Sequence, residues 1–470
     1  MGHHFPEGAD PMSHQPKELH EHHQFHHHHR NDIILPVAAL FGLLLAVFGL
    51  VQAPLPEITK GLWAIITSED VLITDYIALA GMGAAFVNAG LVTIIAAAIL
   101  YMTDESVNGS TLVTIGLMAG FSLFGKNIVN IWPIMFGTAL YALLKREPFA
   151  RYVDISMRTT ALAPIVSFMG CTFSPWAGLF AGLVIGFLIP PVTEYTYQIQ
   201  NGMNLYSIGF ACGLIAMMLV PAFKAFGLTP QTANYWSTGN NLVLGCLMAV
   251  ICLALIIAPL CRKRRKRIWY AYRKLLRTSG RSPSDYLRVF GYGPVLLNMG
   301  INGLIATAYI LLIGGDLNGP TIGAIFTIMG FSAYGKHAFN IIPVMAGVLL
   351  GSLLNRVPFN SSALQIAGLF GTTLAPFSGF FGWPFGVLAG LLHSSVVLHA
   401  GLPLEGMNLY NNGFSGGLVA IVLYPIITSL VRHRRPVLQA EDLFDVFEHD
   451  EPQRSSTLIQ HDNDDIQMPH

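Results

Sequence analysis

The sequence is poor in charged residues. Only 11% of its 470 residues are Asp, Glu, Lys or Arg, whereas 53% are hydrophobic. A soluble globular protein carries about 25% charged residues. Such a chain could not cover its surface in water, and its Lys and Arg residues cluster in a few loops and tails. This patterning is typical of a membrane protein and shows no basic surface for a nucleic-acid partner.

Several kinds of functional site are also missing. The five cysteines have none of the pair spacings that metal or redox sites use. The apolar runs hold almost no Asp or Glu, the residues that proton relays and divalent-cation sites need. There is no nucleotide-binding motif, so ATP could not drive the protein without a partner. An embedded enzyme or receptor would need a nucleophile, metal ligands or a sensory domain, and none is found. We therefore expect neither an enzyme nor a bound cofactor or metal.

Long apolar runs are what the sequence does contain. Helices of about 20 apolar residues cross the hydrocarbon core of a bilayer. Runs of this kind occupy residues 33–53, 77–102, 242–260 and 295–313. Because 32 polar residues precede the first run, we interpret it as a retained helix and not as a signal peptide. The sequence predicts an all-α integral membrane protein.

The apolar region contains an internal duplication. The string GFSLFGKNIVNIWPIMFG at 120–137 returns as GFSAYGKHAFNIIPVMAG at 330–347, which is 210 positions later. Downstream, GMNLYSIGF at 202–210 returns as GMNLYNNGF at 406–414. Repeats of this length identify a two-part architecture. We predict homologous halves at 75–226 and 289–431.

Each half is predicted to contain a long helix, two interrupted hairpins and a final helix. The first hairpin covers 111–144 with a break at 125–127, and the second covers 160–192 with a break around 170–175. The second half breaks at 335–337 and around 379–384. Gly, Pro and polar residues mark these breaks. The hairpins either span the membrane or re-enter it, so the number of crossings lies between six and fourteen.

Basic segments predict how the halves are oriented. Short loops rich in Lys and Arg stay in the cytoplasm, and these loops lie at 145–158, 262–288 and 432–435. All three reach the cytoplasm only if the second half is inverted relative to the first. Inverted repeats with interrupted helices are typical of secondary transporters, whose substrate site lies near the midplane. We expect a multi-pass protein of the plasma membrane, with both termini cytoplasmic.

The remaining segments complete the predicted organisation. Residues 33–53 form a first transmembrane helix, 239–261 a connecting transmembrane helix and 262–288 a basic cytoplasmic linker. Residues 1–32 hold ten histidines and are predicted to be a disordered tail, which is favoured over a loose metal site. The acidic segment 439–470 is predicted to be a disordered cytoplasmic tail.

Two lysines are the strongest candidates for function. Lys126 and Lys336 occupy equivalent positions, each about 15 apolar residues into a hairpin, where a lysine is costly and by default functional. At a re-entrant tip the following helix begins with free N–H groups, and a lysine there adds to an anion-attracting site. In the alternative, the hairpins span the bilayer and each lysine reaches water at the opposite face.

Polar residues beside the lysines extend the candidate site. They supply hydrogen-bonding groups for a solute, although bonding between helices explains them equally well. The substrate-binding candidates besides the lysines are Ser122, Ser332, Asn127, His337, Asn130, Asn340, Asn204, Tyr206, Asn408 and Tyr410. The last four open the final helix of each half, where capping is the competing interpretation.

The repeated GFSxxGK and GMNLY motifs support a resemblance. Over about residues 33–435 the chain resembles a family of bacterial multi-pass membrane proteins known only as a domain of unknown function. The resemblance implies a bacterial-type plasma-membrane protein without an established substrate. The leading hypothesis is a secondary carrier for a small polar or anionic solute, with the lipid bilayer as its surroundings. The alternative is a passive channel for a neutral solute such as urea. A homo-oligomer is compatible with either.

Overall fold

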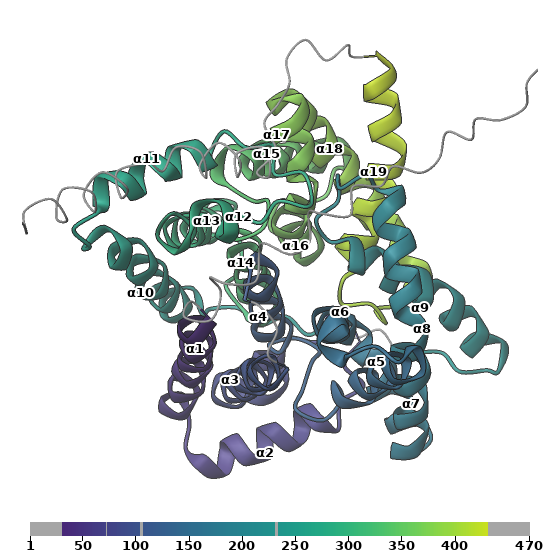
Figure 1. The fold of residues 1–470 in the computed structure, drawn as a ribbon. Helices are drawn as coiled ribbons and strands as arrows, with labels where there is room; N and C mark the ends of the chain where they lie inside the picture. Colours follow the sequence, from purple (N-terminus) through teal and green to yellow (C-terminus); the bar gives the residue numbers. More distant parts are fainter. Residues whose placement is uncertain (1–30, 72, 104–106, 231–233, 431–470) are drawn as a thin grey trace, which may run out of the picture.

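The computed structural model describes residues 31–71, 73–103, 107–230 and 234–430, and within them the chain is built from helices (Figure 1). Both predicted tails, 1–32 and 439–470, and the basic segment 432–435 fall almost wholly outside the described residues. Ten helical stretches of the described chain are long and apolar enough to cross a membrane. These include the four long spans predicted from the sequence, which confirms an all-α membrane protein.

The helices follow the same order in the two halves. In the first half they are α1 (Asn31–Gln52), α2 (Leu55–Ile66), α3 (Tyr76–Met102), α4 (Gly109–Phe121), α5 (Trp132–Lys145), α6 (Val153–Thr159), α7 (Ala163–Thr172), α8 (Pro175–Ile199) and α9 (Ser207–Ala225). In the second half they are α10 (Asn241–Leu260), α11 (Arg265–Leu275), α12 (Tyr286–Phe290), α13 (Tyr292–Leu312), α14 (Gly319–Phe331), α15 (Ala338–Asn355), α16 (Ser362–Phe370), α17 (Ala375–Phe381), α18 (Trp383–Ala400) and α19 (Asn411–Leu430).

Equivalent breaks in the backbone mark the duplication. The long helix of each half is interrupted near its start by a glycine with positive φ, Gly81 (φ 83°) in the first half and Gly291 (φ 74°) in the second. Glycine reaches this conformation without a steric penalty. The break divides α12 from α13 and kinks α3 at the same position.

The equivalence extends to the first helix of each half, α1 and α10, which lie before the repeat boundaries predicted from the sequence. α1 packs against α3 and α10 packs against α13. At these contacts a Cβ on Gly90 would lie 2.6 Å from the carbonyl oxygen of Gly42, and one on Gly300 would lie 2.6 Å from that of Cys252. Small residues allow membrane helices to approach this closely. The helices assigned from the sequence as a first span and a connecting span therefore occupy matching positions.

The two halves meet along α4 and α14, which lie side by side at the centre of the molecule (Figure 1). A Cβ on Gly120 would lie 2.4 Å from the carbonyl oxygen of Gly323, and the reverse distance is also 2.4 Å. At the other end, a Cβ on Gly330 would lie 2.9 Å from the carbonyl oxygen of Leu112. Equivalent helices thus run antiparallel to each other.

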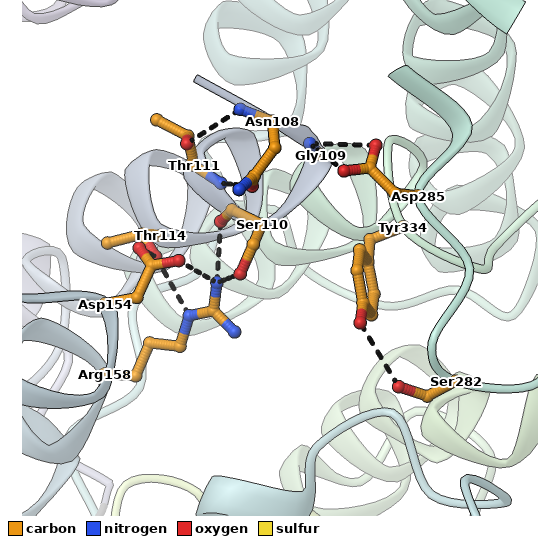
Figure 2. Close-up of polar contacts among 10 residues, drawn as sticks. All are labelled: Asn108, Gly109, Ser110, Thr111, Thr114, Asp154, Arg158, Ser282, Asp285 and Tyr334. Atoms are coloured by element: carbon orange, nitrogen blue, oxygen red, sulfur yellow. Dashed lines mark hydrogen bonds and ion pairs between the residues drawn. The ribbon is translucent and has the colours of Figure 1, made fainter. Parts of the chain in front are cut away.

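Each half caps the central helix of the other. The Asp75 carboxylate accepts a hydrogen bond from the Gly319 N–H (3.1 Å), at the start of α14. Reciprocally, both carboxylate oxygens of Asp285 accept from the Gly109 N–H (3.0 and 3.1 Å), at the start of α4 (Figure 2). Negative charge at a helix N-terminus is stabilising because the first N–H groups lack partners inside the helix. These caps fix the relative position of the halves.

The first predicted hairpin of each half has a sharp tip where the sequence placed a break. Gly125 (φ 143°) and Gly335 (φ 96°) turn the chain immediately before Lys126 and Lys336. The Asn88 side-chain amide donates to the carbonyl of Lys126 (2.9 Å), and the Asn298 amide donates to that of Lys336 (2.7 Å). α4 and α14 have only 13 residues each, or about 20 Å of helix, which is too short to cross a bilayer of about 30 Å.

The second hairpin of each half differs in detail from its predicted form. The predicted breaks at 170–175 and 379–384 are the turns before α8 and α18, which then run uninterrupted. A further interruption precedes them, because short 3-10 turns at Thr160–Leu162 and Gly371–Leu374 separate α6 from α7 and α16 from α17. The second of these turns contributes Thr372, which contacts Lys336 as described below.

Candidate functional site

Both candidate lysines are buried inside the protein. Lys126 and Lys336 have no exposed surface, and neither forms an ion pair with any residue that the structure describes. The alternative interpretation of the hairpins required each lysine to reach water at a membrane face. The buried positions of both lysines do not agree with it. A buried ammonium group without a counter-ion is costly, and in a membrane protein it indicates a functional site.

The two lysines differ in their bonding. The Lys336 Nζ donates to the hydroxyls of Tyr206 and Thr372, the latter at 2.7 Å, and lies 4.4 Å from the centre of the Tyr206 ring. The Lys126 Nζ has only two long contacts, with the Met157 carbonyl oxygen (3.4 Å) and the Met118 sulfur (3.6 Å). Sulfur is a weak acceptor, so Lys126 is the less satisfied of the two.

Five rings form a cluster, here called the aromatic cluster, and three of them, Phe121, Tyr206 and Phe331, contact the lysines. The rings of Tyr206 and Tyr410 lie 5.2 Å apart, and each tyrosine packs 4.7 Å from a phenylalanine, Phe331 and Phe121 respectively. Phe370 completes the cluster, 5.7 Å from Phe121. The tyrosines come from the predicted GMNLY motifs, and the phenylalanines come from α4, α14 and α16. The cluster thus combines both halves.

One hydroxyl in the aromatic cluster has no partner. The Tyr410 hydroxyl is buried and makes no hydrogen bond to the described residues, whereas its counterpart Tyr206 is bonded to Lys336. Tyr410 and the Lys126 Nζ both lie against the Phe121 ring, at 4.7 and 5.2 Å. Unpaired buried polar groups are rare and call for an explanation. A bound anion that accepts from both groups would supply one.

Most of the other predicted site residues hold the backbone in place. The Asn130 amide donates to the Gly125 carbonyl (3.0 Å), and the Asn340 amide donates to that of Gly335 (2.8 Å). Similar bonds to the backbone, within the hairpins or between the halves, are made by Ser122, Ser332, Asn127, His337, Asn204 and Asn408. Of the predicted set, the structure brings together Lys126, Lys336, Tyr206 and Tyr410 at the aromatic cluster.

A buried carboxylate that the sequence did not suggest holds the first hairpin tip. Asp70 is 1% exposed and lies in the loop before α3. It accepts hydrogen bonds from the amides of Asn127 and Asn130 (both 3.1 Å) and from the hydroxyls of Ser167 (2.7 Å) and Tyr76 (2.6 Å). Its counterpart in the second half is a glycine. The first tip is therefore held by a carboxyl group that the second tip lacks.

The Asp70 carboxylate is expected to make stability depend on pH. Burial raises its pKa from 3.8 to about 7, against its hydrogen bonds, which lower it. Because the pKa is higher in the folded than in the unfolded state, stability is greatest below about pH 4 and falls as pH rises to about 7. We expect the thermal midpoint to fall between pH 5 and pH 8, and to fall less in Asp70→Asn. Equal slopes in Asp70→Asn and in the exposed-site control Glu57→Gln would contradict this assignment.

A cavity of about 540 Å³ opens beside the aromatic cluster. Its walls come from α5, α6, α8 and α9 and from the loops around Ser282 and Tyr334. Phe331 and Leu205 line it, and behind Phe331 the Lys336 Nζ lies 5.3 Å from the ring. Arg158 also lines it, next in sequence to Met157, whose carbonyl contacts Lys126. Neither lysine lines the cavity, but Phe331 of its lining contacts Lys336, and Arg158 of its lining is next in sequence to a contact of Lys126.

Arg158, which lines this cavity, is held by a group of polar residues (Figure 2). Arg158 pairs with Asp154 (3.2 Å) and donates to the Ser110 carbonyl (2.6 Å) and the Thr114 hydroxyl (2.9 Å). From the sequence, Arg158 belongs to a basic loop, and it served only to predict the orientation of the halves in the membrane. Among the described residues there is no cluster of three or more His, Cys, Asp or Glu side chains that could bind a metal.

One protein family matches most of the chain. A family model described as "Protein of unknown function (DUF1576)" matches residues 55–225 and 264–429. The chain belongs to this family. The two DUF1576 segments correspond to the two halves, and the second begins at α11, upstream of the boundary at 289 expected from the sequence. The predicted family resemblance is confirmed.

A curated relative of the DUF1576 chain is the peptide transporter CstA of Bacillus subtilis (strain 168). It is 23% identical over 255 residues, which cover 47% of this chain and 40% of that protein. The match thus spans less than half of the relative's length. No solved structure matches the chain significantly. Together with ten apolar helices, this similarity indicates a multi-pass membrane protein related to transporters.

Proposed function

We propose that this protein is a secondary carrier for a small anionic solute, which binds at the aromatic cluster between the two halves. Lys126 and Lys336 supply the positive charge, and the tyrosine hydroxyls supply neutral donors. The observation that carries the proposal is that Lys126 and Tyr410 are both buried against the Phe121 ring. The Lys126 Nζ has only long contacts there, and the Tyr410 hydroxyl has no hydrogen bond to the described residues. Both groups would be satisfied by donating hydrogen bonds to one bound anion, and bonds of this charge-assisted kind are strong.

The proposed carrier has inverted halves in the plasma membrane, with both termini cytoplasmic. Support comes from α4 and α14, which are equivalent helices packed antiparallel. A two-fold axis that relates antiparallel neighbours is perpendicular to them, so it lies in the membrane plane if these helices follow the membrane normal. The basic segments at 145–158 and 262–288 then face the same side, as the positive-inside rule requires.

The buried lysines favour a carrier over the channel alternative. In a channel for a neutral solute, lysines would lie at the pore mouths, but here both are enclosed. One cavity of the described structure has Phe331 and Leu205 in its lining, and Phe331 lies between this lining and Lys336. This is the geometry that alternating access needs, with a central site reached from one face at a time. The relative named a peptide transporter supports an organic solute, which we expect to carry a carboxylate.

Uptake into proteoliposomes tests the carrier. We expect uptake of a short-chain carboxylate such as propionate to saturate, and efflux of the labelled solute to accelerate when unlabelled propionate is added on the opposite side. The neutral isostere propionamide should be taken up more slowly by at least about tenfold, because it lacks the charge that the lysines recognise. Uptake that increases linearly with concentration, or that is equal for the amide, would favour a channel for neutral solutes.

A further inference from the structure

The polar group that holds Arg158 beside the cavity belongs to the first half only. Reciprocal backbone bonds, Leu205 N–H to Thr373 and Leu409 N–H to Ala161, align α6 with α16. The second-half counterparts of Arg158, Asp154, Thr114 and Ser110 are Phe370, Ile366, Ala324 and Pro320, all apolar and buried. Because the second half packs with apolar residues at the same positions, packing alone does not require this polar group. Its presence on one side points to a role specific to that side.

The guanidinium group of Arg158 is fixed with one edge left free. Its Nε and Nη2 atoms are occupied by Thr114, Ser110 and Asp154, whereas Nη1 has no hydrogen bond to the described residues and is drawn without one in Figure 2. Because the other two nitrogens are held, the free edge is already oriented. A preorganised donor loses little entropy when it binds an oxygen anion.

A tyrosine lines the same cavity as Arg158. The Tyr334 hydroxyl accepts from Ser282 (3.4 Å), and its own proton has no acceptor among the described residues (Figure 2). Its counterpart in the first half, Phe124, has no hydroxyl and is fully buried. Like Arg158, Tyr334 is a polar residue that lines the cavity, and its counterpart in the other half is an apolar residue.

The other charged groups of the cavity leave Arg158 as its main anion receptor. Arg151 is largely exposed and already pairs with Glu147 at 3.1 Å. Glu194 lines the wall and is exposed to solvent. Neither supplies a free, held cationic edge like that of Arg158.

We propose that Arg158 and Tyr334 form an entry site for the carboxylate of the solute, separate from the lysines and present on this face only. One carboxylate oxygen accepts from Nη1 of Arg158 and the other accepts from the Tyr334 hydroxyl. Phe331 then separates this site from Lys336. The inference rests on the proposed function, and it adds a second anion-binding position to the central one.

The test measures equilibrium binding of propionate to the purified full-length chain by calorimetry. In the double variant Lys126→Met, Lys336→Met the entry site remains, so we expect residual propionate binding. Adding Arg158→Gln should weaken this residual binding by at least about tenfold, the value of a charged hydrogen bond. Adding Tyr334→Phe, which removes only a hydroxyl, should weaken it by about threefold to fivefold. Arg151→Gln serves as the control and should leave it unchanged.

The outcomes separate the entry site from the proposed function. If the parent binds propionate and the double-lysine variant binds none, the entry site does not exist but the central site stands. Residual binding that is insensitive to both Arg158→Gln and Tyr334→Phe also overturns the entry site. If the parent itself binds no carboxylate, the proposed function fails as well. Because Tyr334→Phe keeps the ring, it remains informative if Arg158→Gln does not fold.

Discussion

A Lys336→Met variant is expected to lose carboxylate uptake by about tenfold to a hundredfold, the range that corresponds to the loss of a charged hydrogen bond. The same variant should fold as well as the parent or better. Lys336 has no ionic partner among the described residues, so its removal leaves no buried charge unpaired. Replacing a buried charge with an apolar residue of similar size is often neutral or stabilising.

Uptake and thermal midpoint, measured together, distinguish a functional lysine from a structural one. Lys126→Met should behave in the same way, since Lys126 has the weaker contacts of the two. The control is Lys224→Met, which removes a partly exposed lysine that pairs with Glu405 and should leave uptake within about twofold, as surface ion pairs contribute little. A folded Lys336→Met protein with normal uptake would exclude the lysine from the site.

A Gly120→Ala substitution is expected to destabilise the protein strongly. A Cβ at this position would lie 2.4 Å from the backbone carbonyl oxygen of Gly323, and backbone atoms cannot move aside as a flexible side chain can. α4 and α14 would have to separate, and both Asp caps at their ends depend on that contact. Overpacking of this kind costs about 1–3 kcal/mol or more.

Gly245→Ala provides the matched control. This glycine lies in α10, and the nearest atom to its added Cβ is a leucine methyl at 3.7 Å, which is ordinary contact. Gly-to-Ala changes inside helices are otherwise stabilising by about 0.5–1 kcal/mol. The midpoint of thermal unfolding in detergent should fall in Gly120→Ala and stay equal or rise in Gly245→Ala. Equal midpoints would mean that the two halves do not meet at this contact.

Features set by local sequence were predicted well. Apolar run length defined α1, α3, α10 and α13 to within a few residues, because a span needs a minimum number of apolar residues. The glycines before each lysine marked the hairpin tips. Repeated strings of letters gave the two halves directly.

Features that depend on distant partners were missed. Asp70 follows the amphipathic α2, and two of its acceptor contacts, to Asn130 and Ser167, lie 60 and 97 positions away. Arg158 lies in a basic segment, and the positive-inside rule was enough to explain its charge. Its position in the lining of a cavity was therefore not predicted. For the asparagines beside Lys126, the sequence left solute binding and structural hydrogen bonding equally open. In the structure their amides donate to backbone carbonyls and to Asp70. A comparison of the halves position by position would have shown that Arg158 replaces a phenylalanine.

The most direct measurement is the location of a bound carboxylate. Crystals of the protein soaked in 3-bromopropionate, with data collected at the bromine absorption edge, place the bromine by its anomalous signal. We expect a peak inside the aromatic cluster, with the carboxylate beside the Nζ of Lys126 and the Tyr410 hydroxyl. A second peak beside Arg158 is compatible with this result. Peaks at Arg158 or at the lipid-facing surface alone, with none beside either lysine, would contradict an anion site between the halves.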